Sequence, residues 1–143
     1  MQYQKISSNQ YLIKLNKNEK IIESLTKFID ENKIASGFFY GLGAAFRAEV
    51  AHFNVETKKY SNKIFDEPLE ITNLVGTLAI FEDKPLIHPH ITVADSQMQA
   101  FGGHLVEATI SGTCEIVFTD FQKPLYKKLD EEVGLKTFDL SDK

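Results

Sequence analysis

The period of the apolar residues changes along the chain from that of strands to that of a helix and back, and these changes limit the folds that the chain can adopt. After a short alternating stretch at Tyr11–Leu15, apolar side chains recur at helical spacing and form one stripe: Ile21, Ile22, Leu25, Phe28 and Ile29. From Ser36 onward they alternate with polar residues, the period of strands with one buried face. The pattern predicts an α+β fold in which one long helix covers one face of a mostly antiparallel sheet.

Helix-capping and turn-forming residues suggest where these elements begin and end. Asn18 is a plausible N-cap for the helix, which we expect to end near Asn32. Tyr126–Glu132 is compatible with a short helix before Gly134. The strands are expected at Tyr11–Leu15, Gly37–Tyr40, Ala45–Asn54, Lys59–Phe65, Glu70–Phe81, Ile87–Ala94, Leu105–Ile110 and Thr113–Asp120, with Asn54–Lys58 as a hairpin turn.

Length and hydropathy are typical of a single globular domain outside the membrane. Its 143 residues are close to the common size of one domain, so we expect a single domain over 1–143. No apolar run approaches the roughly 18 residues of a membrane span, which predicts no membrane partner. The stretch MQYQKISSNQ lacks the apolar core of a secretory signal. We therefore expect a cytoplasmic protein.

Charge bears on the choice between small ligands and nucleic acid. The net charge is −4, and Arg47 is the only arginine, although arginine is the residue most used for guanine and phosphate contacts. DNA is therefore not supported as a partner by charge. The alternative stays open that an oligomer of this chain binds DNA through a local lysine-rich face and acts as a transcriptional regulator.

A lone cysteine and a glycine pair both receive structural interpretations. Cys114 shares a predicted strand face with Ile116 and Phe118, which favours a core thiol over a catalytic one. Gly41 and Gly43 follow a predicted strand but lack the third glycine of a dinucleotide fingerprint. We expect them to make a tight bend or to let strands pack closely.

Three of the four histidines fall between positions 88 and 104. Pro89 favours extended backbone at His88, so His88 and His90 share one face of a strand that is either an edge or needs no ladder bond at position 89. His104 follows Gly102-Gly103, a pair that lets backbone approach closely or take positive φ where we expect the chain to turn back. Three imidazoles can hold a metal ion and leave a coordination position open for water or substrate. They can also bind a small anionic ligand. His52 lies apart from them and is interpreted as structural.

Several motifs together resemble the PPC domain, which plants and prokaryotes share. They are Gly37–Ala44, Phe65–Glu70, His88-Pro-His90, Phe101–Glu107 with its Gly-Gly-His-Leu, and Asp130–Leu135. The resemblance covers about residues 10–140. It implies an α+β fold with a central antiparallel sheet and assembly as a homotrimer.

The same resemblance bears on function. His88, His90 and His104 match histidines of prokaryotic members, which implies a site for a divalent transition metal, with zinc the first expectation, or for a small anionic ligand. Plant members bind DNA through an AT-hook, and this chain has no such Arg-Gly-Arg-Pro segment. Whether the chain is an enzyme stays open, because no reaction is established for the family.

Overall fold

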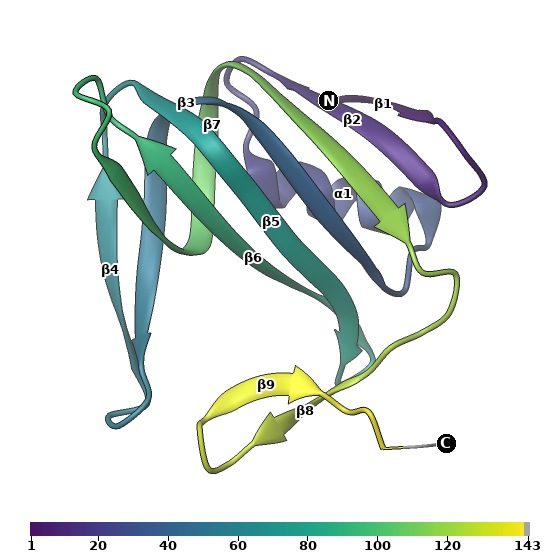
Figure 1. The fold of residues 1–143 in the computed structure, drawn as a ribbon. Helices are drawn as coiled ribbons and strands as arrows, with labels where there is room; N and C mark the ends of the chain where they lie inside the picture. The colour runs from purple at the N-terminus through teal and green to yellow at the C-terminus, as the bar shows by residue number, and fades with distance from the viewer. Residues whose placement is uncertain (142–143) are drawn as a thin grey trace.

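The computed structural model describes residues 1–141, which form one helix and nine strands. The helix α1 spans Ile21–Asn32, and the strands are β1 Gln2–Lys5, β2 Gln10–Asn16, β3 Gly37–Asn54, β4 Lys59–Phe65, β5 Leu69–Phe81, β6 Lys84–Ala94, β7 Ala100–Asp120, β8 Lys127–Asp130 and β9 Leu135–Phe138. The first seven strands form an antiparallel sheet in the order β1-β2-β7-β6-β5-β3-β4. α1 lies across one face of this sheet (Figure 1), which confirms the expected arrangement of one helix on an antiparallel sheet.

The helix is short rather than long, and it begins later than predicted. It has 12 residues, and its buried side chains, Ile21, Leu25, Phe28 and Ile29, belong to the predicted stripe. The residues before it are tied to β7 instead: the Asn18 amide donates to the Ile110 carbonyl, and the Ile110 amide donates to the Glu19 carbonyl. These bonds hold positions 18 and 19 outside the helix, so Asn18 is not its N-cap.

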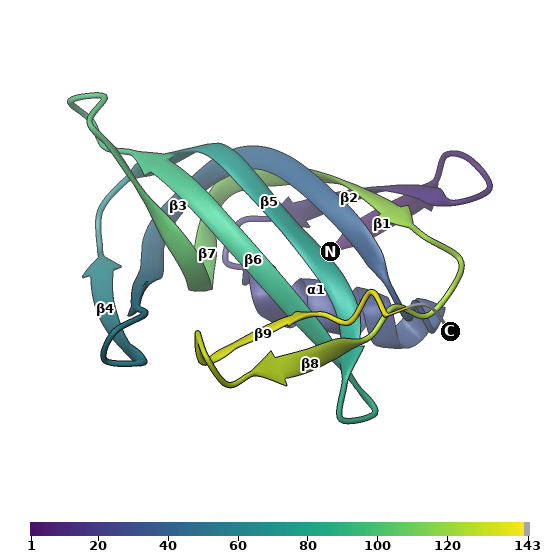
Figure 2. The ribbon, with the colours of Figure 1, turned by 60° about the horizontal axis from the view of Figure 1, so that its bottom comes forward.

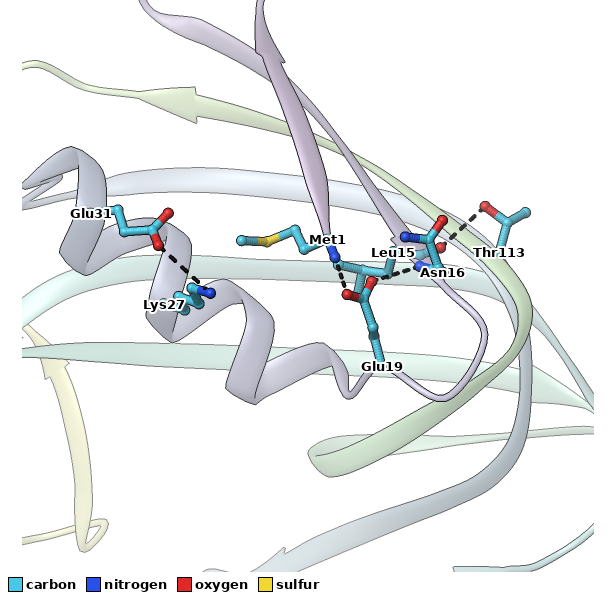
Figure 3. A network of polar contacts seen from close by, with 7 residues as sticks. All are labelled: Met1, Leu15, Asn16, Glu19, Lys27, Glu31 and Thr113. Carbon is cyan, nitrogen blue, oxygen red and sulfur yellow. Dashed lines mark hydrogen bonds and ion pairs between the residues drawn. The ribbon is translucent and has the colours of Figure 1, made fainter.

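Two glutamates organise the start of the helix. The Glu107 carboxylate on β7 accepts hydrogen bonds from the amides of Ile22 and Glu23, in place of a local N-cap side chain. The Glu19 carboxylate accepts from the Asn16 amide at 2.7 Å and from the Met1 amino group (Figure 3). The helix ends where Lys33 adopts a left-handed conformation.

Two strands, β3 and β7, each join two segments that the sequence predicted as separate strands, Leu105–Ile110 and Thr113–Asp120 in the case of β7. β3 joins two predicted strands and carries a bulge between Gly41 and Gly43. A Cβ on Gly43 would lie 2.4 Å from the Thr113 carbonyl oxygen, which confirms that this glycine allows close strand packing. β3, β5, β6 and β7 pair in a closed ring, because β7 pairs with both β6 and β3.

The predicted turn at Gly102-Gly103 is wrong, because both glycines lie inside β7. The chain reverses earlier, at Asp95–Gln99, where the Asp95 carboxylate accepts from the amides of Gln97 and Gln99. Gly103 serves close approach instead, since a Cβ there would lie 2.7 Å from the Ala51 carbonyl oxygen.

The core fills the space between α1 and the sheet. Phe28 of α1 contacts Phe118 of β7 edge to face at 5.4 Å between ring centroids, and Phe118 stacks on Phe39 of β3 at 6.0 Å. Cys114 is fully buried on the same face as Phe118, as predicted, and burial raises the pKa of its thiol to about 12.

The carboxyl-terminal segment forms a hairpin, not the short helix considered for Tyr126–Glu132. β8 and β9 pair there, and Tyr126 bridges to Ile80 of β5. Figures 1 and 2 show this hairpin beside the turn between β5 and β6. Among residues 1–141, no helix has the length and apolarity that crossing a bilayer requires.

Candidate metal site

Three imidazoles converge on the sheet face opposite α1. His88 and His90 lie two residues apart on β6 and point to one face. His90 is paired directly with His104 of β7, so that side chain shares the face. β6 pairs with β7 only from His90 onward, so Pro89 needs no ladder bond on that side, as its sequence context suggested.

The imidazoles lie close enough to contact one ion. One nitrogen from each of His88, His90 and His104 lies within 4.8 Å of the others. The ring centroids are 5.3 Å apart for His88 and His90, 5.6 Å for His88 and His104, and 5.7 Å for His90 and His104. The predicted convergence of these three residues is therefore present in the structure.

One imidazole of the cluster has a ring nitrogen without a protein partner among the described residues. Nδ1 of His104 is buried and makes no hydrogen bond to any residue within 1–141. A buried ring nitrogen without a partner is costly unless a ligand or an ion satisfies it. The donor set also suits a metal, because imidazole is a common ligand of Zn²⁺ and related ions.

The surroundings of His88 and His104 favour the neutral form of these two imidazoles, which is the form that binds metals. Desolvation lowers the pKa of His88 to about 4, helped by the positive charge of Lys127 and by its neighbouring histidines. Desolvation and His90 lower the pKa of His104. Protons therefore compete weakly with a metal for these two residues at neutral pH.

A pocket of about 480 Å³ opens beside the cluster and lies within the size range of small-molecule sites. His88 and His104 form part of its wall, and Tyr60 of β4 contacts the His104 ring at 5.7 Å between centroids. The β8–β9 hairpin supplies much of the rest, including Lys127 and Leu135. His90 is outside the lining, at the exposed side of the cluster.

Comparison with known proteins places the chain in a family. A family model for the Plants and Prokaryotes Conserved (PCC) domain, written PPC above, matches residues 3–122. The chain belongs to this family. Among curated proteins, none matches the chain.

Solved structures of similar chains have the same fold. A candidate DNA-binding protein from Bacteroides thetaiotaomicron is 34% identical, covers 96% of each chain and gives a TM-score of 0.93. One from Ralstonia eutropha is 30% identical, with 97% of this chain and 96% of that chain covered and a TM-score of 0.89. A metal-containing protein from Archaeoglobus fulgidus is 24% identical, with 96% and 98% covered and a TM-score of 0.85.

The site also includes one residue that the sequence interpretation missed, and this residue lies beyond the segment 3–122 that the PCC family model matches. Lys127 is buried in the pocket, and its Nζ lies 3.4 Å from Nδ1 of His88. The available signal was the alternation of Leu125, Lys127 and Leu129, which places the lysine on an apolar face. His52 is exposed on β3 outside the cluster, in line with its separate interpretation.

Proposed function

We propose that this PCC-domain protein binds a divalent transition metal through His88, His90 and His104, with zinc as the first choice. The observation that carries the proposal is the convergence of three imidazoles, one of which has a buried nitrogen without a partner. Three protein ligands leave a position for water or substrate. A zinc ion held this way would act as a Lewis acid and lower the pKa of a bound water toward about 7. We assign no reaction to the site.

Two further observations support metal binding. The lowered pKa values of His88 and His104 favour the unprotonated rings that a metal needs. The similar protein from Archaeoglobus fulgidus is described as metal-containing. A small anionic ligand, the alternative for the cluster, would favour protonated imidazoles, which these lowered pKa values oppose.

Metal analysis of untagged protein tests this proposal. After incubation with zinc and desalting, we expect one zinc per chain in the native protein and a large loss in His88→Ala and His104→Ala. His52→Ala is the matched control, because His52 is an exposed histidine of the same sheet outside the cluster. Equal zinc in all four proteins, or none in the native protein, would show that the cluster does not bind the metal.

We also propose that the protein is a homotrimer. An outer apolar patch lies on the sheet face that carries the histidines: Leu12 of β2 is paired with the half-buried Val117 of β7, and Val117 with Tyr40 of β3. Leu12 is 44% exposed and Tyr40 53%, and such a patch is typical of protein interfaces. Sedimentation equilibrium tests this assembly, and a monomer at micromolar concentration would contradict it.

DNA binding is the second candidate, because two similar proteins are described as candidates for that function. The net charge of −4 and the single arginine oppose it. Titration with duplex DNA at rising salt distinguishes the two functions, since phosphate contacts impose a steep salt dependence. We expect no salt-sensitive binding. Tight binding that weakens steeply with salt would favour the regulatory role.

A further inference from the structure

Lys127 is a buried cation that lacks a counter-charge. Only 7% of its surface is exposed, although it begins a short strand of the carboxyl-terminal hairpin. Its contacts are Nδ1 of His88 at 3.4 Å and the ring of Phe138, 5.0 Å from Nζ. It forms no ion pair with a carboxylate of residues 1–141. Burying an ammonium without an anion is costly, so a lysine held this way points to an absent negative partner.

The lining of the pocket around Lys127 contains no acid. Among the described residues it includes no aspartate or glutamate, and the second lysine of the lining, Lys136, is exposed with its Nζ over the ring of Phe81. The neutral imidazoles of His88 and His104 cannot balance the charge of a divalent ion. With a divalent metal bound by the histidines, the ammonium, which contacts His88, would have a second positive charge nearby. A negative group between the metal and the ammonium would remove this repulsion.

One wall of the pocket is apolar, although Tyr60 and Asn62 also belong to the lining, and this wall limits the class of anion that fits. Side chains of β6, β7 and the hairpin form this wall: Leu86, Ile87, Val106, Leu129 and Leu135. Inorganic phosphate would leave these side chains without a partner. An organic acid would place its anionic group near Lys127 and its hydrocarbon against the wall.

We propose that the pocket binds a small carboxylate with an apolar body, whose carboxylate lies between the Lys127 ammonium and a metal held by the three histidines. This inference rests on the proposed metal site. Lys127 supplies a charge-assisted hydrogen bond, and the apolar wall selects the hydrocarbon part. The β8–β9 hairpin, which carries Lys127 and Leu135, is therefore part of the ligand site and not only a carboxyl-terminal extension of the sheet.

Calorimetric titration of hexanoate into the zinc-loaded protein tests this inference. We expect hexanoate to bind more tightly than acetate, which lacks most of the hydrocarbon, and more tightly than hexanamide, which lacks the charge. Inorganic phosphate should also bind more weakly than hexanoate. Lys127→Met, which keeps most of the side-chain volume, should weaken hexanoate binding by about tenfold or more. Lys128→Met is the matched control, because Lys128 is an exposed neighbour on β8, and it should bind like the native protein.

Zinc content and unfolding temperature are measured for each variant. If Lys127→Met does not fold, Lys127→Arg, which keeps the positive charge, should retain hexanoate binding. Zinc binding without hexanoate binding, or equal binding to Lys127→Met, would overturn this inference and leave the metal site intact. Tighter binding of phosphate than of hexanoate would also overturn it. Absence of zinc from the native protein would refute the metal site itself; a Lys127-dependent hexanoate affinity of that protein would then show an anion pocket without a metal.

Discussion

His90 of β6 lies directly opposite His104 of β7, as paired residues of two neighbouring antiparallel strands. Both imidazoles are therefore held by the backbone of the sheet, not by a loop. His88 lies two residues before His90 on β6 and therefore points to the same face. The pairing of β6 with β7 thus fixes the directions of all three side chains. Such a site is preorganised, which lowers the ordering cost of binding an ion.

The protonation of His88 should report this arrangement. In the metal-free protein we expect its midpoint near pH 4 by NMR titration, well below that of an unfolded histidine at about 6.5. The folded state then binds fewer protons than the unfolded state between these values, so the metal-free protein should lose stability as the pH falls from 6.5 to 4. Lys127→Met should raise the midpoint, because a neighbouring positive charge is removed. A midpoint near 6.5 in the native protein would contradict the desolvated site.

A second prediction concerns Glu107 as a remote cap of α1. Its carboxylate accepts from the amides of Ile22 and Glu23, so Glu107→Ala leaves two helix amides without partners. We expect the free energy of unfolding to fall by about 0.5–2 kcal/mol in urea denaturation. Glu115→Ala is the control, since Glu115 is an exposed glutamate of the same strand. Equal effects of the two substitutions would show that the cap contributes nothing.

The extent to which the sequence could predict this structure depended on the range of each interaction. The shared face of His88 and His90 follows from strand period, a local property. The position of His104 depends on the turn, which the Asp95 carboxylate forms several residues before the glycines that suggested it. Asn18 is a good N-cap by residue type, but its backbone is bonded to Ile110, far along the chain. Tertiary contacts therefore determine both the start of the helix and the position of the turn before β7.

The burial of Lys127 at the candidate site likewise depends on a contact between segments that are distant in the sequence. Its alternation with leucines is local, yet its burial beside His88 depends on the hairpin packing near Ile80 of β5. No sequence motif marks that contact. The family resemblance also directed attention to the histidines, whereas the lysine was found only from its burial in the structure.

The third prediction compares two glycines of the sheet region. An added Cβ at Gly43 would lie 2.4 Å from the Thr113 carbonyl oxygen, and that oxygen belongs to backbone that cannot easily move. Gly43→Ala should therefore destabilise the protein by about 1–3 kcal/mol, the usual cost of overpacking. Gly112→Ala is the control, because an added Cβ there meets no atom within 4 Å. Thermal unfolding of both variants measures the difference, and equal stability would show that the strands tolerate the extra methyl group.

The last prediction tests whether the outer apolar patch mediates assembly. Tyr40 is paired with Val117 on one side and with Val75 on the other, and Val75 is paired with His90, so the patch and the histidines lie on one face. Tyr40→Lys would place an unpaired charge in an interface formed by this patch, which costs several kcal/mol. Sedimentation equilibrium should therefore show a shift from trimer toward monomer with an unchanged circular dichroism spectrum. Val55→Lys, at an exposed apolar residue of the β3–β4 turn, should leave the trimer intact. A trimer that survives Tyr40→Lys unchanged would mean that the subunits associate through another surface.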